Sequence, residues 1–126
     1  MKTHFLNPPR RFDSDGTGRF MSTDVGTVEL AADEVVTFVS GAGSEYDVAR
    51  KAWGYYATPS LNSRLPAKGL RPVLVCNAGG RFFVCLVESG REAEFADYLA
   101  QTAMTAVARL DDAETLARIK SAVQGR

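Results

Sequence analysis

The chain is poor in the residues that catalytic and metal sites most often use. Its 126 residues include one histidine, His4, one tryptophan, Trp53, and two cysteines, Cys76 and Cys85. One histidine and two cysteines do not assemble a zinc site unless carboxylates complete it. A cysteine nucleophile needs a base within hydrogen-bonding reach, and His4 lies in an aperiodic stretch. We therefore expect both cysteines to be apolar packing residues, and we predict no metal and no cofactor.

The chain also lacks net charge and long apolar runs. Fifteen basic and fifteen acidic side chains cancel, which disfavours nucleic acid as a partner because phosphate backbones attract basic proteins. No run approaches the roughly 20 apolar residues that cross a bilayer, so no membrane partner is expected. Residues 1–9 contain no apolar signal core. With both cysteines in apolar runs, these features predict a cytoplasmic protein with reduced thiols.

The order of the expected elements predicts an α+β fold with a mainly antiparallel sheet built from hairpins and C-terminal helices packed on it. Residues 1–24 are rich in Pro, Gly, Asp and Ser without periodicity, and we interpret them as a flexible N-terminal arm. Residues 25–126 then form a single α+β domain. Its first strands are expected at 25–30, 34–39 and 45–51, with a turn at 41–44.

A second hairpin is the firmest structural prediction. Residues 72–77 and 81–87 are apolar strands around Ala78-Gly79-Gly80, where glycine permits a tight turn. One face is expected to carry Leu74, Cys76, Phe83, Cys85 and Val87, and the other Val73, Val75, Phe82, Val84 and Leu86. Because both faces are apolar, we expect the hairpin to be covered on both sides or to lie at the most buried point of the structure.

The C-terminal third reads mainly as helix. Ser89 and Glu92 have capping-box spacing, and Phe95, Leu99 and Ala103 follow as a helical stripe. Residues 105–110 could extend that helix or form a short strand, and the sequence leaves the two open. Asp111 and Glu114 repeat the capping logic. A final helix carrying Leu116, Ile119 and Val123 is expected to end at a C-cap glycine, Gly125.

Two loops resemble ligand motifs without completing them. Residues 13–18 place oxygen ligands and a glycine as a calcium loop does, with Asp24 at its twelfth position. That position should be a glutamate and the loop should join two helices, so we interpret residues 13–18 as an Asp-Gly turn. Gly41-Ala42-Gly43 lacks the third glycine of a dinucleotide loop, and we interpret it as a hairpin turn.

Residues 50–71 carry the strongest functional signal. This segment joins aromatic rings, hydrogen-bonding groups and an excess of basic residues, the mixture found in ligand sites and protein interfaces. The predicted ligand-binding residues are Arg50, Lys51, Trp53, Tyr55, Tyr56, Thr58, Ser60, Asn62 and Arg64. The alternative is a proline-punctuated loop that an aromatic side chain anchors to the sheet, with its polar groups satisfying the backbone.

A catalytic interpretation has few candidates. Glu45 or Asp47 could act as a base, with Arg64 as an anion clamp, because alternate residues of a strand share one face. Exposed charged pairs on strands are usually only solvent-facing, however. No residue is therefore assigned a catalytic role.

Part of the chain resembles a group of known proteins. The stretch from Trp53 to Asn62, WGYYATPSLN, together with Tyr46-Asp47 and Gly69-Leu70-Arg71, resembles small uncharacterised bacterial proteins associated with surface-polysaccharide biosynthesis. The likeness covers roughly residues 34–111. It implies an accessory role near nucleotide-sugar metabolism and carries over no catalytic residues.

Three functions follow from these patterns. The first is a non-enzymatic binding or accessory domain that uses residues 50–71 to hold a small anion, such as a nucleotide or sugar phosphate, or a partner protein. The second is a small enzyme acting on a nucleotide-linked or carbohydrate substrate. The third is a structural homo-oligomer that buries the aromatic residues at its interface.

Overall fold

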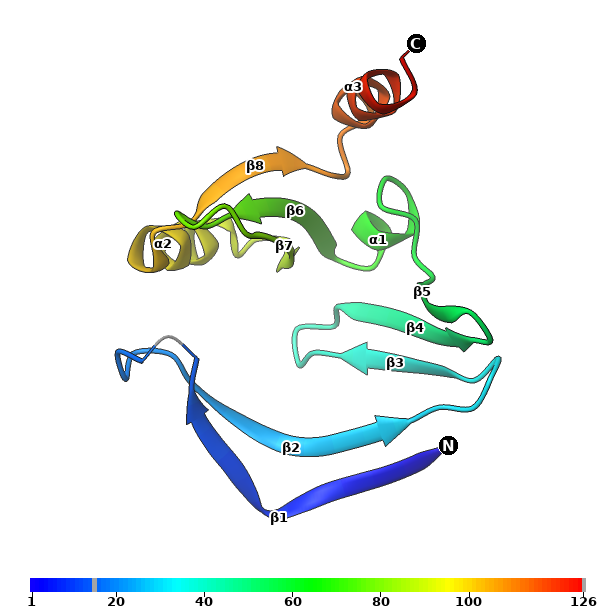
Figure 1. Ribbon diagram of the computed structural model, residues 1–126, viewed down its shortest axis with the longest axis vertical. Coiled ribbons are helices and arrows are strands. Elements are labelled where there is room, and N and C mark those ends of the chain that lie inside the picture. The colour runs from blue at the N-terminus through cyan, green and yellow to red at the C-terminus, as the bar shows by residue number, and fades with distance from the viewer. Residues whose placement is uncertain (15, 126) are drawn as a thin grey trace. The chain divides into compact units, whose positions relative to one another are not determined.

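A computed structural model describes residues 1–14 and 16–125 (Figure 1). These residues form strands and helices in the order β1 (Lys2–Asp13), β2 (Met21–Glu29), β3 (Val35–Val39), β4 (Glu45–Lys51), β5 (Gly54–Ala57), α1 (Arg64–Ala67), β6 (Leu70–Cys76), β7 (Phe82–Glu88), α2 (Glu92–Thr102), β8 (Thr105–Arg109) and α3 (Ala113–Gln124). The sheets are β1-β2, β3-β4-β5 and β7-β6-β8. The predicted α+β class, with antiparallel hairpin-built sheets and C-terminal helices, is confirmed.

The chain divides into two compact units. The first consists of Met1–Val35 and Ala49–Tyr56, and the second of Val36–Val48 and Ala57–Arg126. The division passes through the β3-β4-β5 sheet, and each unit is described by itself. The domain boundary expected between residues 24 and 25 stays a prediction.

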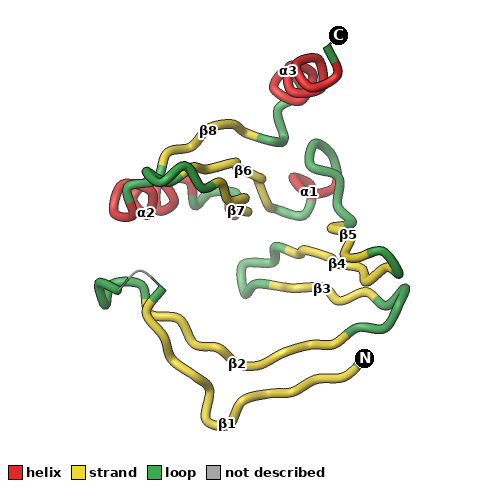
Figure 2. The backbone as a smooth tube through the Cα atoms, viewed as in Figure 1, coloured by secondary structure: helices red, strands yellow, loops and turns green. Residues whose placement is uncertain are grey.

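The first unit contains an antiparallel hairpin of β1 and β2, drawn as continuous strands in Figure 2. β1 and the start of β2 lie within residues 1–24, where no strand was expected, and the flexibility of this segment stays a prediction. The ladder runs from Lys2 to Phe5, breaks, and resumes at Arg10. Pro8 and Pro9 fall in the break, where their missing N–H groups cost no ladder hydrogen bond. The prolines therefore interrupt the strand without ending it.

Gly26 lets the two strands of this hairpin approach. It lies opposite Phe5 in the register, with φ of +141°. A Cβ atom built at this position would collide with the carbonyl oxygen of His4. Only glycine therefore combines this backbone conformation with this close contact.

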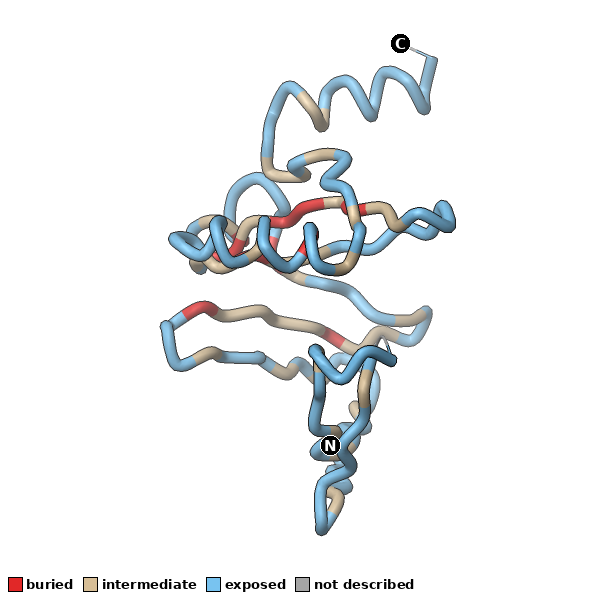
Figure 3. The backbone as a smooth tube through the Cα atoms, turned by 90° about the vertical axis from the view of Figure 1, so that its left-hand side faces the viewer, coloured by how far each residue is buried: buried red, intermediate tan, exposed pale blue. Residues whose placement is uncertain are grey.

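In the second unit, β6 is the central strand and pairs antiparallel with both β7 and β8. Val73 and Val75 of β6 form the core with Val87 of β7 and Leu99 of α2. Phe95 and Met104 pack against this cluster, so α2 covers one face of the sheet. In Figure 3, several of the residues coloured as buried belong to β6.

The predicted assignment of side chains to the two faces of this hairpin is wrong. Val73 pairs with Cys85 and Cys76 with Phe82. Directly paired residues of antiparallel strands share a face. The face toward α2 therefore carries Val73, Val75, Phe83, Cys85 and Val87, and the opposite face carries Leu74, Cys76, Phe82, Val84 and Leu86.

The turn closes the hairpin in this register. It spans residues 77–81, with hydrogen bonds from Asn77 N–H to the Arg81 carbonyl (3.0 Å) and from Arg81 N–H to Asn77 Oδ1 (2.9 Å). Phe82 and Val84, on the face away from α2, are 60% and 57% exposed. The hairpin is therefore not covered on both faces. The other alternative, a position at the most buried point, agrees with the buried Leu70, Val73 and Val75 of β6.

The helix ends differ from the sequence prediction by one or two residues. The N-cap of α2 is Arg91, and no side chain caps this helix, so the expected Ser89 capping box is wrong. Asp112, rather than Asp111, caps α3 by accepting from Thr115 N–H (2.9 Å). The C-cap of α3 is Gly125, as predicted. Residues 105–109, left open by the sequence, form β8, because Ala103 turns the chain with φ of +55° directly after α2.

Replacing Gly26 by alanine should loosen the β1-β2 hairpin by roughly 3 kcal/mol, the cost of a backbone held in a disfavoured conformation against a close contact. Hydrogen exchange of the β1 and β2 amides measures this loss. Gly18→Ala is the control, since Gly18 has φ of +79° but a Cβ atom built there would meet no atom within 4 Å, and it should cost roughly 1 kcal/mol. Equal loss of protection in both variants would contradict the role assigned to the close approach.

Candidate functional site

The predicted ligand-binding residues fall into both units of the chain. Residues 50–56 belong to the first unit and residues 57–64 to the second. We therefore describe them as two surfaces. Their grouping into a single site stays a prediction.

The first surface is the aromatic turn, residues 50–56, where β4 ends and β5 begins. Trp53 and Tyr55 are 73% and 68% exposed, and Tyr56 is also exposed. The Arg50 guanidinium lies 5.5 Å from the centre of the Tyr55 ring and donates to the Gly54 carbonyl at 3.1 Å. This cation–π contact holds the ring in place and leaves Trp53 projecting from the turn.

The charges near the aromatic turn are largely engaged within the chain. The Lys51 ammonium donates to Asp33 at 2.9 Å. Arg50 is held between the Tyr55 ring and the Gly54 carbonyl. An anion approaching this surface would have to displace the Asp33 carboxylate from Lys51. The turn is therefore better suited to apolar and stacking contacts than to holding a phosphate.

The second surface consists of Thr58, Ser60, Asn62 and Arg64. Thr58 N–H donates to the Asp47 carbonyl at 3.2 Å, and Ser60 Oγ accepts from the N–H of Arg64 at 2.9 Å. These bonds fix the loop that leads into α1. Asn62 is exposed. The Ser60 hydroxyl thus satisfies a backbone group, as the loop interpretation expected, whereas the Thr58 bond joins two backbone groups.

Asp47 and Arg64 form an ion pair with a distance of 3.0 Å between Nη2 and Oδ2. The Thr37 hydroxyl also donates to Asp47, at 2.7 Å. The Thr37 hydrogen bond and, after it, the hydrogen bond and charge of Arg64 lower the pKa of Asp47. A carboxylate held ionised in this way is a weaker base, and its partner Arg64 is already occupied.

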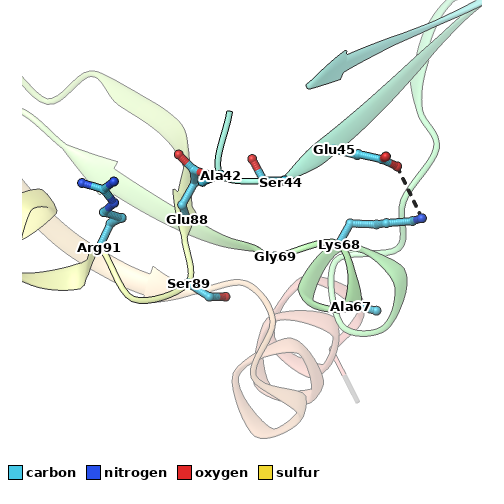
Figure 4. A pocket seen from close by; sticks show the side chains of 10 residues that line it. Ala42, Ser44, Glu45, Ala67, Lys68, Gly69, Glu88, Ser89 and Arg91 are labelled. Atoms are coloured by element: carbon cyan, nitrogen blue, oxygen red, sulfur yellow. Dashed lines mark ion pairs between the residues drawn. The ribbon is translucent and has the colours of Figure 1, made fainter. Parts of the chain in front are cut away.

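The second unit also contains a cavity of about 470 Å³ (Figure 4). Three segments form its wall: the turn between β3 and β4, the chain from the end of α1 into β6, and the end of β7 with the loop before α2. Its lining residues are Ala42, Gly43, Ser44, Glu45, Ala67, Lys68, Gly69, Glu88, Ser89 and Arg91. The volume lies within the range of small-molecule sites. We call it the 42–91 cavity.

A hydrogen-bond network fixes one side of this cavity. The Ser40 hydroxyl donates to Glu88 Oε2 at 2.8 Å and lies 2.8 Å from the hydroxyl of the buried Ser44. The backbone joins the other segments, because Glu45 N–H donates to the Lys68 carbonyl and Ser89 N–H donates to the Gly69 carbonyl. The wall is therefore held by hydrogen bonds between residues at least 20 positions apart in sequence.

The charged groups of the lining balance one another. Glu45 pairs with Lys68 at 3.4 Å, drawn as the dashed line in Figure 4. Arg91 donates to Glu94 at 2.8 Å, and this bond and charge raise the pKa of Arg91 further. Glu88 is the second acid of the lining. Two carboxylates and two cations thus offer both hydrogen-bond acceptors and donors to a ligand.

Sequence patterns identified only part of this cavity. Ala67, Lys68 and Gly69 lie within the predicted 50–71 segment, and Glu45 was a candidate base. The contribution of Glu88 and Arg91 carried no sequence signal, since the spacing Ser89-Glu92 suggested a helix cap instead. Gly41-Ala42-Gly43 was expected to be a turn, and the structure places it there between β3 and β4.

Across residues 1–14 and 16–125, no group of three or more His, Cys, Asp or Glu side chains is placed to hold a metal ion. The calcium-like loop includes Asp15, which lies outside the described residues. None of the helices in the described chain is long and apolar enough to cross a membrane. Comparison with protein-family models, curated proteins and solved structures gives no match to this chain. The resemblance through WGYYATPSLN stays a prediction.

Asp47 should make stability depend on pH. Its pKa is lower in the folded chain, so its contribution is complete above the pKa of an unfolded aspartate and is lost as pH falls through the folded pKa. Asp47→Asn should therefore lower the free energy of unfolding at pH 7, and the difference from wild type should shrink in acid. Chemical denaturation at several pH values measures this.

Asp97→Asn, an exposed position on α2, is the matched control and should leave the pH profile of wild type intact. A difference between Asp47→Asn and wild type that stays constant from neutral to acidic pH would contradict the ion-pair explanation.

Proposed function

We propose that the protein is a non-enzymatic binding or accessory domain that holds a small polyhydroxyl ligand, a sugar or the sugar part of a larger molecule, in the 42–91 cavity. The observation that carries this proposal is the cavity itself, about 470 Å³ with a polar, charge-balanced lining. The C-terminal end of the predicted 50–71 segment, Ala67–Gly69, contributes one wall.

The balance of charges supports a neutral ligand over an anion. A phosphate would meet the carboxylates of Glu45 and Glu88 as well as the cations of Lys68 and Arg91. Each hydroxyl of a sugar both donates and accepts, so it can use carboxylates and cations together. Ser44 and the neighbouring Ser40 add hydroxyls that are already held in place. This ligand class also agrees with the expectation of an accessory role near nucleotide-sugar metabolism.

The geometry supports binding over catalysis. Asp47 and Arg64, the candidate base and clamp, are bonded to each other. Glu45, the other candidate base, is paired with Lys68. A general base must be free to take a proton from substrate within hydrogen-bonding distance. Pairing within the chain gives both carboxylates a positioning role instead.

Saturation-transfer NMR with glucose, N-acetylglucosamine, UDP-glucose and inorganic phosphate tests the proposal. We expect the sugars and the sugar of UDP-glucose to bind, and Glu88→Gln to weaken binding roughly tenfold, the value of one hydrogen bond to a charged group. Glu114→Gln, an exposed carboxylate on α3 outside the lining, should bind as wild type does.

The proposal fails if none of the sugars binds, or if folded Glu88→Gln binds them as tightly as wild type. Binding of inorganic phosphate alone would also overturn it, in favour of the small-anion hypothesis. Far-UV circular dichroism checks that Glu88→Gln keeps its fold, since the Ser40 hydroxyl donates to this side chain.

The aromatic turn supports a second function, docking of a partner protein. Trp53 and Tyr55 are among the most exposed large side chains of the chain. Exposed tryptophan and tyrosine are the residues that most often dominate binding energy at protein interfaces. The contact between Arg50 and Tyr55 lowers the entropy lost when a partner binds, because the ring is already held.

Trp53 is the only tryptophan, so its fluorescence reports on this surface alone. In dilute protein we expect acrylamide to quench Trp53 nearly as strongly as it quenches free tryptophan, because the side chain is open to solvent. Stern–Volmer analysis over a dilution series measures this. Weak quenching at the lowest concentration would show that the ring is buried within the chain and would contradict the docking surface.

A further inference from the structure

The β7-β6-β8 sheet has two edges, β7 and β8, and β7 is unprotected. Natural proteins guard edge strands with charges, prolines, bulges or short length. From Phe82 to Val87, β7 has none of these, and it pairs only with β6 among the described strands. Phe82, Phe83 and Val84 are exposed. A run of six apolar residues with unpaired backbone groups is a strong template for another strand.

The other edge is less suited to pairing. β8 has five residues, and its ladder with β6 is irregular between Leu74 and Val75. Such an irregularity twists an edge away from further pairing. Arg109, at the end of β8, is held by two hydrogen bonds to Asp111. The sheet is therefore more open to extension at β7.

A groove accompanies the β7 edge. A cavity of about 420 Å³ is lined by Cys85, Leu86, Val87 and Glu88 of β7 and by Arg91, Glu94, Phe95 and Tyr98 from α2 and its N-cap. Successive residues of a strand point to opposite faces. A cavity lined by four consecutive strand residues thus lies along the edge of β7, where an added strand would run.

We propose that β7 pairs antiparallel with β7 of a second copy of this chain, giving a continuous six-stranded sheet across a two-fold axis. The side-chain pattern of the strand favours this occupant. In an antiparallel pairing over Phe82–Glu88, Phe83 lies opposite Val87 and Val84 opposite Leu86, so apolar side chains meet on both faces of the sheet. Full overlap of Phe82–Glu88 places the two-fold axis at the middle residue, Cys85.

Two consequences follow from that proposed register. The Cys85 residues of the two copies lie directly opposite each other, with Cβ atoms roughly 5 Å apart. Val84 of one copy lies opposite Leu86 of the other, on the face away from α2. Cys76 lies on the central strand and on that same outer face, so it is not brought near its counterpart.

Analytical ultracentrifugation over a concentration series tests the proposal. We expect a reversible dimer of the 13.6 kDa chain, and Val84→Lys should weaken it at least roughly tenfold, because lysine is a natural guard of edge strands. Val107→Lys is the matched control, an equally exposed valine on β8, and it should dimerise as wild type does.

Cross-linking with bismaleimidoethane then tests the register. Cys76→Ser should still give a covalent dimer, while Cys85→Ser should not. The proposal is overturned by a monomer at all concentrations, by a dimer indifferent to Val84→Lys, or by one that Val107→Lys disrupts. A dimer lost in Trp53→Ala but kept in Val84→Lys would instead indicate association through the aromatic turn.

Discussion

The second unit depends on β6 being hydrogen-bonded on both sides while its α2-facing side chains are sealed from water. Val75 is fully buried and, with Val73, forms the layer on which α2 rests. The residue before the same strand helps to form the wall of the 42–91 cavity, because the Gly69 carbonyl accepts a hydrogen bond from Ser89 N–H. Just upstream, Leu65 of α1 is also fully buried. The position of β6 therefore determines both the packing of the core and the placement of Lys68 at the 42–91 cavity.

Several charged groups of the described residues hold separate segments of the chain together. Lys51, Arg64 and Lys68 each pair with a carboxylate from another element. Surface ion pairs of this kind add little to the free energy of unfolding, although each one orients the two side chains that form it. The basic bias of residues 50–71 therefore reflects ion pairing within the chain.

The sequence predicted the elements with strong periodicity and missed those set by backbone contacts. The strands of the 72–87 hairpin, the Phe95 and Leu99 positions of the α2 stripe and the Gly125 cap are correct because each depends on local pattern or on a single residue type. β1 was missed because its prolines lie in a ladder break that only pairing reveals. The cavity needed the approach of residues 42–45, 67–69 and 88–91, and contacts between distant segments leave no period in a sequence.

The five-residue turn at 77–81 has a consequence for how this chain can change over evolution. Its odd length puts Val73 and Cys85 on one face. Deleting or inserting one residue there would reverse every side chain of β7 relative to β6, sending Phe82, Val84 and Leu86 under α2 and the core residue Val87 into solvent. Insertions and deletions at this turn should therefore occur in pairs of residues, or together with a compensating bulge, so the packing of the hairpin against α2 constrains the length of an exposed loop.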